Sequence, residues 1–190
     1  MLGILRYALV AVGCLGLTGA VAGAQEVIHA MTGTIRSIDA GQKTFTLFRD
    51  TGLLITFKDM TDAKTAIIND KRIVPDPAAA RAEDKKGAYV IVFYYGSTDS
   101  PTAAAVQALG TGPFTATVGT VANFNEKGRL ISVKDESGAI HSYRINASTV
   151  AESDLGVVEG LKFRAGKGDH VRVVGAVTND DPTALFVNMM

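Results

Sequence analysis

One stretch of this chain occurs twice, and this repeat sets the strongest limit on the fold. Residues 85–106 read KKGAYVIVFYYGSTDSPTAAAV, and residues 166–187 read GKGDHVRVVGAVTNDDPTALFV. Each copy has a run of β-branched or aromatic residues, an acidic turn that ends in Pro-Thr-Ala, and a second apolar run. Because this pattern is typical of a strand, a turn and a second strand, the sequence predicts two copies of one small β-domain.

The repeat extends over most of the chain. Early landmarks differ by 86 positions (119 − 33 and 138 − 52, both between glycines), and late ones by 81 (168 − 87 for Gly, 182 − 101 for Pro). The difference of five residues falls in one connection, where the first copy carries a Pro/Ala-rich insert. Length variation confined to a surface connection is typical of true repeats.

Each copy is expected to hold five strands. Phe45 and Leu47 alternate with Thr44 and Thr46, which is the period of two of a half-buried strand. The expected strands are 32–38, 44–48, 53–57, 88–95 and 103–109 in the first copy, and 115–124, 130–134, 140–145, 170–177 and 184–189 in the second.

Five strands with a long connection between the third and the fourth favour an all-β protein of two tandem five-stranded OB-like Greek-key barrels. We expect a short helical turn in that connection of each copy, after Pro77 in the first and within Ser148–Leu155 in the second. The alternative is one β-sandwich that shares all ten strands. The predicted domains are a signal peptide (1–24), a first barrel (25–110) and a second barrel (111–190).

The N-terminal 24 residues are interpreted as a secretory signal peptide. Arg6 provides a short positive start, an apolar run follows, and Ala22-Gly23-Ala24 is a small-residue cleavage signal. An uncleaved anchor helix and a lipidated Cys14 are the alternatives. We therefore expect a periplasmic or secreted protein with no membrane span after cleavage.

Charge and cysteine content exclude several classes. Lys and Arg number 10 against 9 Asp and Glu over residues 31–110, and 8 against 9 over 114–190. Nucleic-acid binding needs clustered positive charge, so we expect no nucleic-acid partner. Cys14 is the only cysteine, so the cleaved chain has no disulfide or thiolate nucleophile.

Several of these landmarks together resemble a known family. Gly33-Thr34-Ile35, Ile38-Asp39, Phe45-Thr46-Leu47 and Gly168-Asp169-His170-Val171 are similar to the pattern of an exported bacterial domain family of uncharacterised function. The likeness covers nearly all of the chain after residue 24. It consists of glycines and turns, so it implies the fold and offers no catalytic residue.

A metal site is one candidate. His29, Met31 and Met60 show a distant likeness to the His and Met set of periplasmic copper and silver chaperone barrels, and thioether and imidazole suit Cu(I). That family carries a tryptophan beside its ligands, and this chain has none. Ordinary packing of the methionines is the alternative, so we expect no cofactor unless Cu(I) binds.

The aromatic strand at residues 89–95 and the acidic turns are the other candidates. Since residues 89–95 are apolar on both faces, the outer face must be covered by the second copy, the insert or another molecule, in that order of preference. The candidate residues for binding a partner are Tyr89, Phe93, Tyr95, Asp99, Asp180 and Asp181.

His141 and His170 are interpreted as isolated surface histidines, and the sequence has no recognised catalytic motif. We therefore expect a non-catalytic binding protein of the bacterial cell envelope, with an envelope protein or a glycan as partner. A periplasmic Cu(I)-binding protein is the alternative function, and the oligomeric state is left open.

Overall fold

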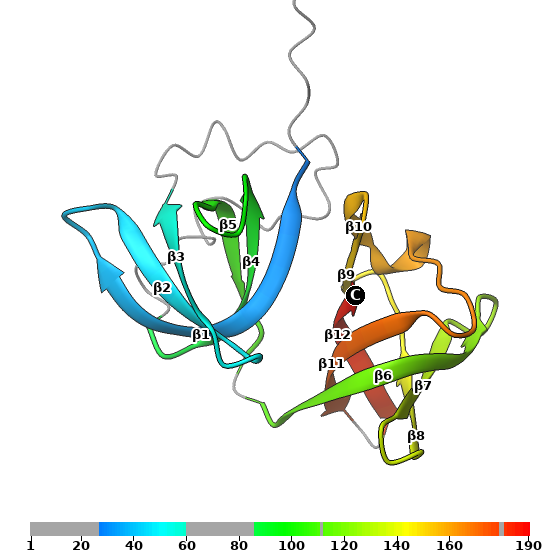
Figure 1. Cartoon of the computed structure of the whole chain (residues 1–190). Helices are drawn as coiled ribbons and strands as arrows, with labels where there is room; N and C mark the ends of the chain where they lie inside the picture. Colours follow the sequence, from blue (N-terminus) through cyan, green and yellow to red (C-terminus); the bar gives the residue numbers. More distant parts are fainter. Residues whose placement is uncertain (1–26, 60–85, 111, 179–180) are drawn as a thin grey trace, which may run out of the picture.

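A computed structural model describes residues 27–59, 86–110, 112–178 and 181–190. It is an all-β protein with two barrels side by side (Figure 1). The first is a closed barrel with the strand order β1-β2-β3-β5-β4. Its strands are β1 (His29–Asp39), β2 (Thr44–Arg49), β3 (Leu54–Asp59), β4 (Tyr89–Tyr95) and β5 (Thr102–Ala108).

The chain of the second barrel follows the same strand topology as that of the first. Its sheet has the order β10-β9-β12-β11-β6-β7-β8, and a parallel pairing of Thr183 with Arg144 joins β12 to β8. In the first barrel, β5 joins β3 in parallel at the equivalent place. The strands are β6 (Phe114–Asn125), β7 (Leu130–Asp135), β8 (Ile140–Arg144), β9 (Val150–Ser153), β10 (Gly156–Glu159), β11 (His170–Thr178) and β12 (Asp181–Met189). Two OB-like barrels are therefore present, and the single sandwich is excluded.

The two barrels share their irregularities as well as their strands. The β1–β2 register shifts between Ile35 and Ser37, and the β6–β7 register shifts between Val121 and Asn123, in both cases 86 positions apart. Gly33 and Gly119 stand where a Cβ would press on the carbonyl oxygen of the neighbouring strand. Because β-bulges and close backbone approaches of this kind bend a strand, both copies close into a barrel in the same way.

The prediction of a helical turn within Ser148–Leu155 is wrong. This segment holds β9 and the turn that leads into β10, and the helical turn of this connection is a 3-10 turn, η1 (Gly160–Lys162), which follows β10. The reason is tertiary, because β9 pairs in parallel with β12 and buries Val150 and Ala151. The turn expected after Pro77 lies outside the described residues.

Three apolar clusters account for the packing. One fills each barrel, and the third lies between them. The third, which we call the junction, uses equivalent positions of the two copies. Its equivalent pairs are Phe93 with Val174 and Ala105 with Phe186, both offset by 81, and Ile28 with Phe114, offset by 86.

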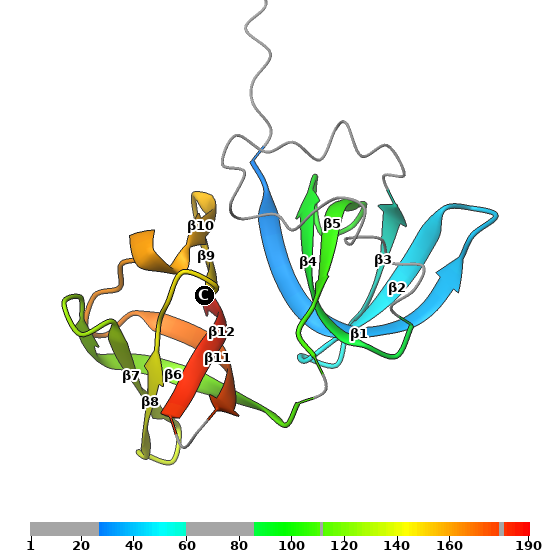
Figure 2. The same ribbon diagram turned by 180° about the vertical axis from the view of Figure 1, so that it is seen from behind.

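The β9–β10 hairpin extends the junction toward the first barrel. Val157 N donates a 2.9 Å hydrogen bond to Ile28 O just before β1, and Figures 1 and 2 both show β10 beside the start of β1. The two barrels are thus joined by apolar packing and by backbone pairing. Among the described residues, no helix has the length and apolar character needed to span a membrane.

Candidate functional site

A cavity of about 530 Å³ opens at one end of the second barrel, and we call it the second-barrel mouth. It lies between the start of β6, the first half of β8 and the start of β12. Its lining residues are Thr115, Ala116, Thr117, His141, Ser142, Tyr143 and Pro182. Mouths of β-barrels are common ligand sites, and this volume lies in the usual range for a small ligand.

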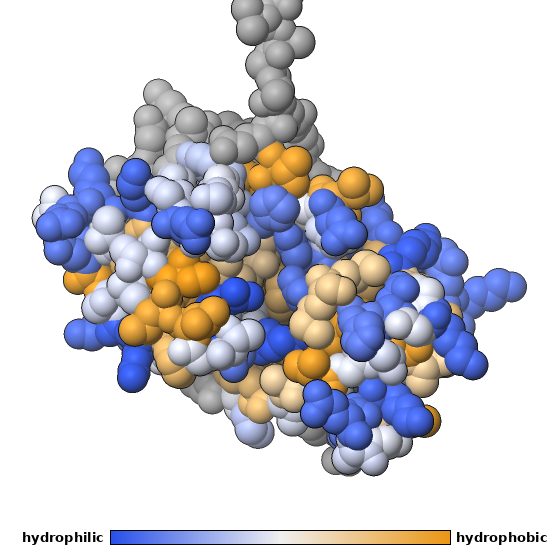
Figure 3. Space-filling view, in the orientation of Figure 1, coloured by the Kyte–Doolittle hydropathy of each residue, from blue (hydrophilic) through white to orange (hydrophobic). Residues whose placement is uncertain are grey.

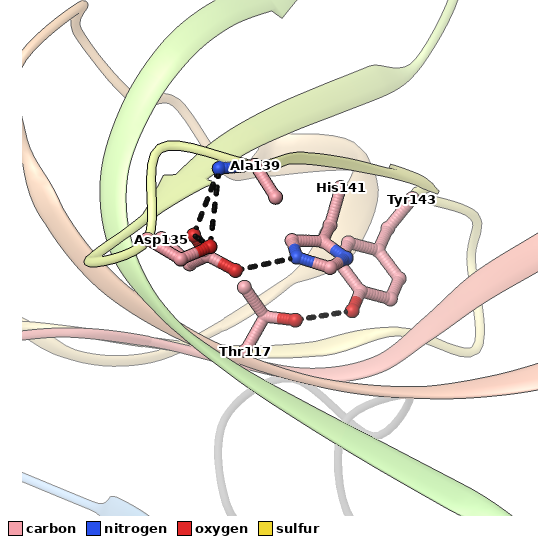
Figure 4. A network of polar contacts seen from close by, with 6 residues as sticks. Thr117, Asp135, Ala139, His141 and Tyr143 are labelled. Atoms are coloured by element: carbon pink, nitrogen blue, oxygen red, sulfur yellow. Dashed lines mark hydrogen bonds and ion pairs between the residues drawn. The ribbon is translucent and has the colours of Figure 1, made fainter.

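The floor of the mouth is a pair of buried hydroxyls. Thr117 Oγ1 and Tyr143 OH are 2.6 Å apart, and the two residues are 7% and 3% exposed (Figure 4). Only one of the two can donate in this hydrogen bond, so the other keeps a hydrogen that it can donate elsewhere. The floor therefore offers a neutral donor.

The rim of the mouth carries an oriented imidazole. His141 Nε2 is 2.8 Å from Asp135 Oδ2, while Asp135 Oδ1 accepts hydrogen bonds from Ser137 Oγ at 2.6 Å and from Ala139 N at 2.9 Å (Figure 4). The Ser137 bond foremost, and then the His141 bond, lower the pKa of Asp135 to about 2.

The carboxylate of Asp135 is therefore ionised at neutral pH, and it accepts a hydrogen bond from a ring nitrogen that carries a hydrogen. In the neutral imidazole, this places the hydrogen of His141 on Nε2 and leaves Nδ1 as a lone-pair acceptor.

In the described part of the first barrel, an aromatic side chain occupies the place that corresponds to this opening. Tyr94 stands where the second barrel has Gly175 (175 − 94 = 81). The Tyr94 ring packs edge-on against Phe57 and tilted against His29, both at 5.7 Å between centroids. At Gly175, a Cβ would lie 2.5 Å from Cε1 of Tyr143, the residue equivalent to Phe57. The absence of a side chain at Gly175 leaves room for the ring of Tyr143, which lines the mouth.

A polar network crosses from the first barrel to the second. Arg172 on β11 forms a short ion pair with Asp50 and donates a 2.8 Å hydrogen bond to Thr32 Oγ1. Asp50 also accepts bonds from Thr32 Oγ1 at 2.8 Å and Tyr89 OH at 2.7 Å. Burial, foremost, raises the pKa of Tyr89. This network fixes the orientation of the two barrels.

A second polar contact crosses the junction at the start of β1. Glu152 accepts a 2.9 Å hydrogen bond from Ala30 N, and its other oxygen is 2.6 Å from His29 Nδ1. Burial raises the pKa of Glu152 despite the bonds from His29 and Ala30 that lower it. Among the described residues, the groups with a raised pKa are Tyr89, Tyr94 and Glu152, and none of them lines the mouth.

The structure places two of the three candidate metal ligands. Met31 is 3% exposed in the core of the first barrel, and His29 bonds to Glu152. Met60 lies outside the described residues, so the Cu(I) set stays a prediction that a Cu(I) titration tests. Within the described ranges, no group of three His, Cys, Asp or Glu could hold a metal ion.

The candidate partner-binding residues do not form one surface. Phe93 is 0% exposed inside the junction, where the second copy covers it. The prediction that Phe93 binds a partner is therefore wrong. Tyr89 packs on Phe114 at 5.0 Å in the same junction, and Tyr95 is half-buried at the other end of β4. Asp99 is exposed in the β4–β5 turn, Asp180 lies outside the described residues, and Asp181 begins β12 beside the mouth-lining Pro182.

Exposed apolar side chains form small areas elsewhere. Phe48, Leu53 and Leu54 are 39%, 59% and 63% exposed around the β2–β3 turn, and Arg36 lies over the Phe48 ring at 5.3 Å. Figure 3 shows one face of the molecule, on which apolar residues lie in separate groups among polar ones. Scattered exposure of this kind is normal for a protein surface.

Sequence reasoning missed the residues of the mouth. It interpreted His141 as an isolated surface histidine, whereas His141 pairs with Asp135 across the β7–β8 hairpin. The available signal was the difference between the copies, since Gly175 replaces Tyr94 and Thr117 replaces Met31 (117 − 31 = 86).

No protein-family model and no curated protein matches the chain. A solved structure described as "drosophila Unr CSD456", a cold-shock-domain protein, matches at 11% identity and a TM-score of 0.30. The match covers 85% of this chain and 61% of that one. The resemblance to an exported bacterial family has no matching family model.

The same comparison corrects one prediction. The prediction that nucleic acid is excluded as a partner is wrong, because the matched structure is a cold-shock-domain protein. A likeness at this TM-score does not argue for any particular partner of this chain.

Proposed function

We propose that this chain is an exported, non-catalytic binding protein whose ligand occupies the second-barrel mouth. The observation that carries this proposal is the contrast between the two barrels. One copy places the Tyr94 ring at this position, whereas the other has Gly175 there and presents a cavity with a buried hydroxyl donor and an oriented imidazole acceptor.

A binding role suits these groups better than catalysis. Nucleophilic catalysis needs a nucleophile within hydrogen-bond reach of a base. The hydroxyls of Thr117 and Tyr143 bond to each other, and Ser142 Oγ is 2.8 Å from Ser132 Oγ. Within the described part of the chain, His141 bonds to Asp135 and to none of these hydroxyls. The groups are arranged to hold a ligand by hydrogen bonds.

Closing the mouth tests the proposal. The triple variant Thr117→Met, Tyr143→Phe and Gly175→Tyr transplants the residues of the first barrel, and we call it the closed variant. A panel of cellobiose, chitobiose, leucine, decanoate and adenosine is screened for thermal stabilisation of the wild type and the closed variant. We expect at least one compound to stabilise only the wild type. Equal shifts in both proteins, or none in either, would contradict the proposal.

A second variant tests the same proposal if the closed variant does not fold. His141→Ile places the residue of the first barrel (Ile55; 141 − 55 = 86) at the rim and leaves the core unchanged. It should weaken the same stabilisation.

Export is part of the proposal and has a separate test. The apolar N-terminal run and the Ala22-Gly23-Ala24 signal support it. In a bacterial host, mass spectrometry of the envelope fraction should find a chain that begins at Gln25. An intact N-terminus in the cytoplasmic fraction would contradict export.

A further inference from the structure

The chemistry of the mouth narrows the class of ligand, and this step rests on the proposed function. Among the described residues, those that line the mouth are hydroxyl, aliphatic or aromatic side chains and one imidazole. No carboxylate, ammonium or guanidinium is among these lining residues. A charged ligand would lose its hydration there without a partner of opposite charge, which is costly.

The carboxylate that binds the imidazole of His141 disfavours anions in the mouth. Asp135 is ionised and holds the outer nitrogen of His141. Its own oxygens are already committed to Ser137, Ala139 and His141. A cation would therefore compete with three existing hydrogen bonds, and an anion would be repelled.

The hydrogen-bonding groups of the mouth form a complementary pair. The floor supplies one neutral hydroxyl donor from the Thr117–Tyr143 pair, and the rim supplies the Nδ1 acceptor of His141. A ligand hydroxyl can satisfy either group, because it both donates and accepts. A ligand with hydroxyls on neighbouring carbons satisfies both at once.

The remaining wall is apolar. Ala116, Pro182 and the ring of Tyr143 supply carbon surface beside the polar groups. A sugar ring combines a C–H face with an edge of neutral hydroxyls, so it matches an apolar wall beside a donor and an acceptor. Fatty chains lack the hydroxyls, and free amino acids carry two charges.

We propose that the second-barrel mouth binds a neutral saccharide residue. A sugar hydroxyl donates to His141 Nδ1, another accepts from the floor hydroxyl, and the C–H face lies against Ala116 and Pro182.

Isothermal titration calorimetry of the full chain after signal removal tests this proposal. The neutral probes are cellobiose and chitobiose, of which only chitobiose carries acetamido groups. The charged probes are galacturonate and glucosamine, and the remaining probes are an N-acetyl dipeptide amide and a short oligothymidine. We expect a neutral disaccharide to bind. The difference in affinity between cellobiose and chitobiose shows whether an acetamido group contributes.

Two single variants locate the binding. His141→Ile removes the acceptor and Tyr143→Phe removes a floor hydroxyl, and each should weaken neutral-sugar binding roughly 3- to 10-fold. Thr46→Val is the control, because Thr46 and Thr56 form an exposed hydroxyl pair at 3.2 Å in the first barrel, at the positions that correspond to Ser132 and Ser142. It should leave the affinity unchanged.

The results separate this inference from the proposed function. A charged sugar, a peptide or an oligonucleotide that binds at the mouth more tightly than both neutral sugars would overturn the saccharide assignment and leave the mouth as the binding site. Neutral-sugar binding that is unchanged in both His141→Ile and the closed variant would overturn both.

Discussion

Cε1 of Tyr143 lies 2.5 Å from the place that a Cβ on Gly175 would occupy. The two residues come from β8 and β11, and Thr183 O on β12 is 3.2 Å from the same point. Even the smallest side chain at position 175 must displace the Tyr143 ring. The geometry of the mouth therefore depends on one glycine.

Gly175→Ala should destabilise the chain and disturb the floor of the mouth. Overpacking a tight core costs about 1–3 kcal/mol, and a shifted Tyr143 loses its bond to Thr117. Urea unfolding measures the change. Gly166→Ala is the control, because its added Cβ would meet only the Asp169 side chain at 3.4 Å. Equal stability of wild type and Gly175→Ala would show that Tyr143 moves freely.

Asp50→Asn should loosen the junction. The substitution removes the charge that Arg172 pairs with, and hydrogen bonds to charged groups contribute about 1.5–3 kcal/mol. We expect a comparable loss in the free energy of unfolding and a separation of the two barrels in small-angle scattering. Asp99→Asn, at an exposed turn position, is the control. An unchanged scattering profile and unchanged stability would contradict a role for this ion pair.

Glu152→Gln should change how stability depends on pH. Burial raises the pKa of Glu152, so its contribution is fully present below its unfolded pKa and declines as pH rises through the folded value. The wild type should therefore be less stable than Glu152→Gln at pH 7.5 and equal to it at pH 4. Urea unfolding at both values measures this, with the exposed Glu126→Gln as control. A wild type that is more stable than the variant at pH 7.5 would show that the His29 and Ala30 bonds outweigh burial.

The Asp135 carboxyl should titrate near pH 2. Its pKa is lowered from the ordinary value, so its contribution to stability is present above the ordinary value and is lost as pH falls toward 2. Carbon-detected NMR follows the carboxyl directly. Ser137→Ala should raise the midpoint more than His141→Ile does, since the Ser137 bond is the larger cause. A midpoint near 4 in the wild type would contradict the network around His141.

Local patterns predicted most of the fold. Alternation such as Phe45 and Leu47 against Thr44 and Thr46 marked strands whose observed bounds differ from expectation by a few residues. The β9–β10 hairpin was missed because Val150 and Ala151, besides pairing with β10, are held in the sheet by β12, some 36 residues away (186 − 150). A single-sequence pattern has no access to such a partner.

The candidate site was harder to predict for the same reason. Arg172 and Asp50 are 122 positions apart, and Thr117 and Tyr143 meet only when the barrel closes. The repeat itself contained a usable signal at one place, where Tyr94 in one copy corresponds to Gly175 in the other. That difference acquires meaning only once the packing around Tyr143 is known.

The most direct measurement is an amide NMR titration of the full chain, after signal removal, with cellobiose and with chitobiose. We predict that the largest shifts occur at Ala116, His141 and Tyr143, and that the closed variant loses them. Shifts centred on the first barrel, or the same shifts in the closed variant, would contradict binding at the second-barrel mouth.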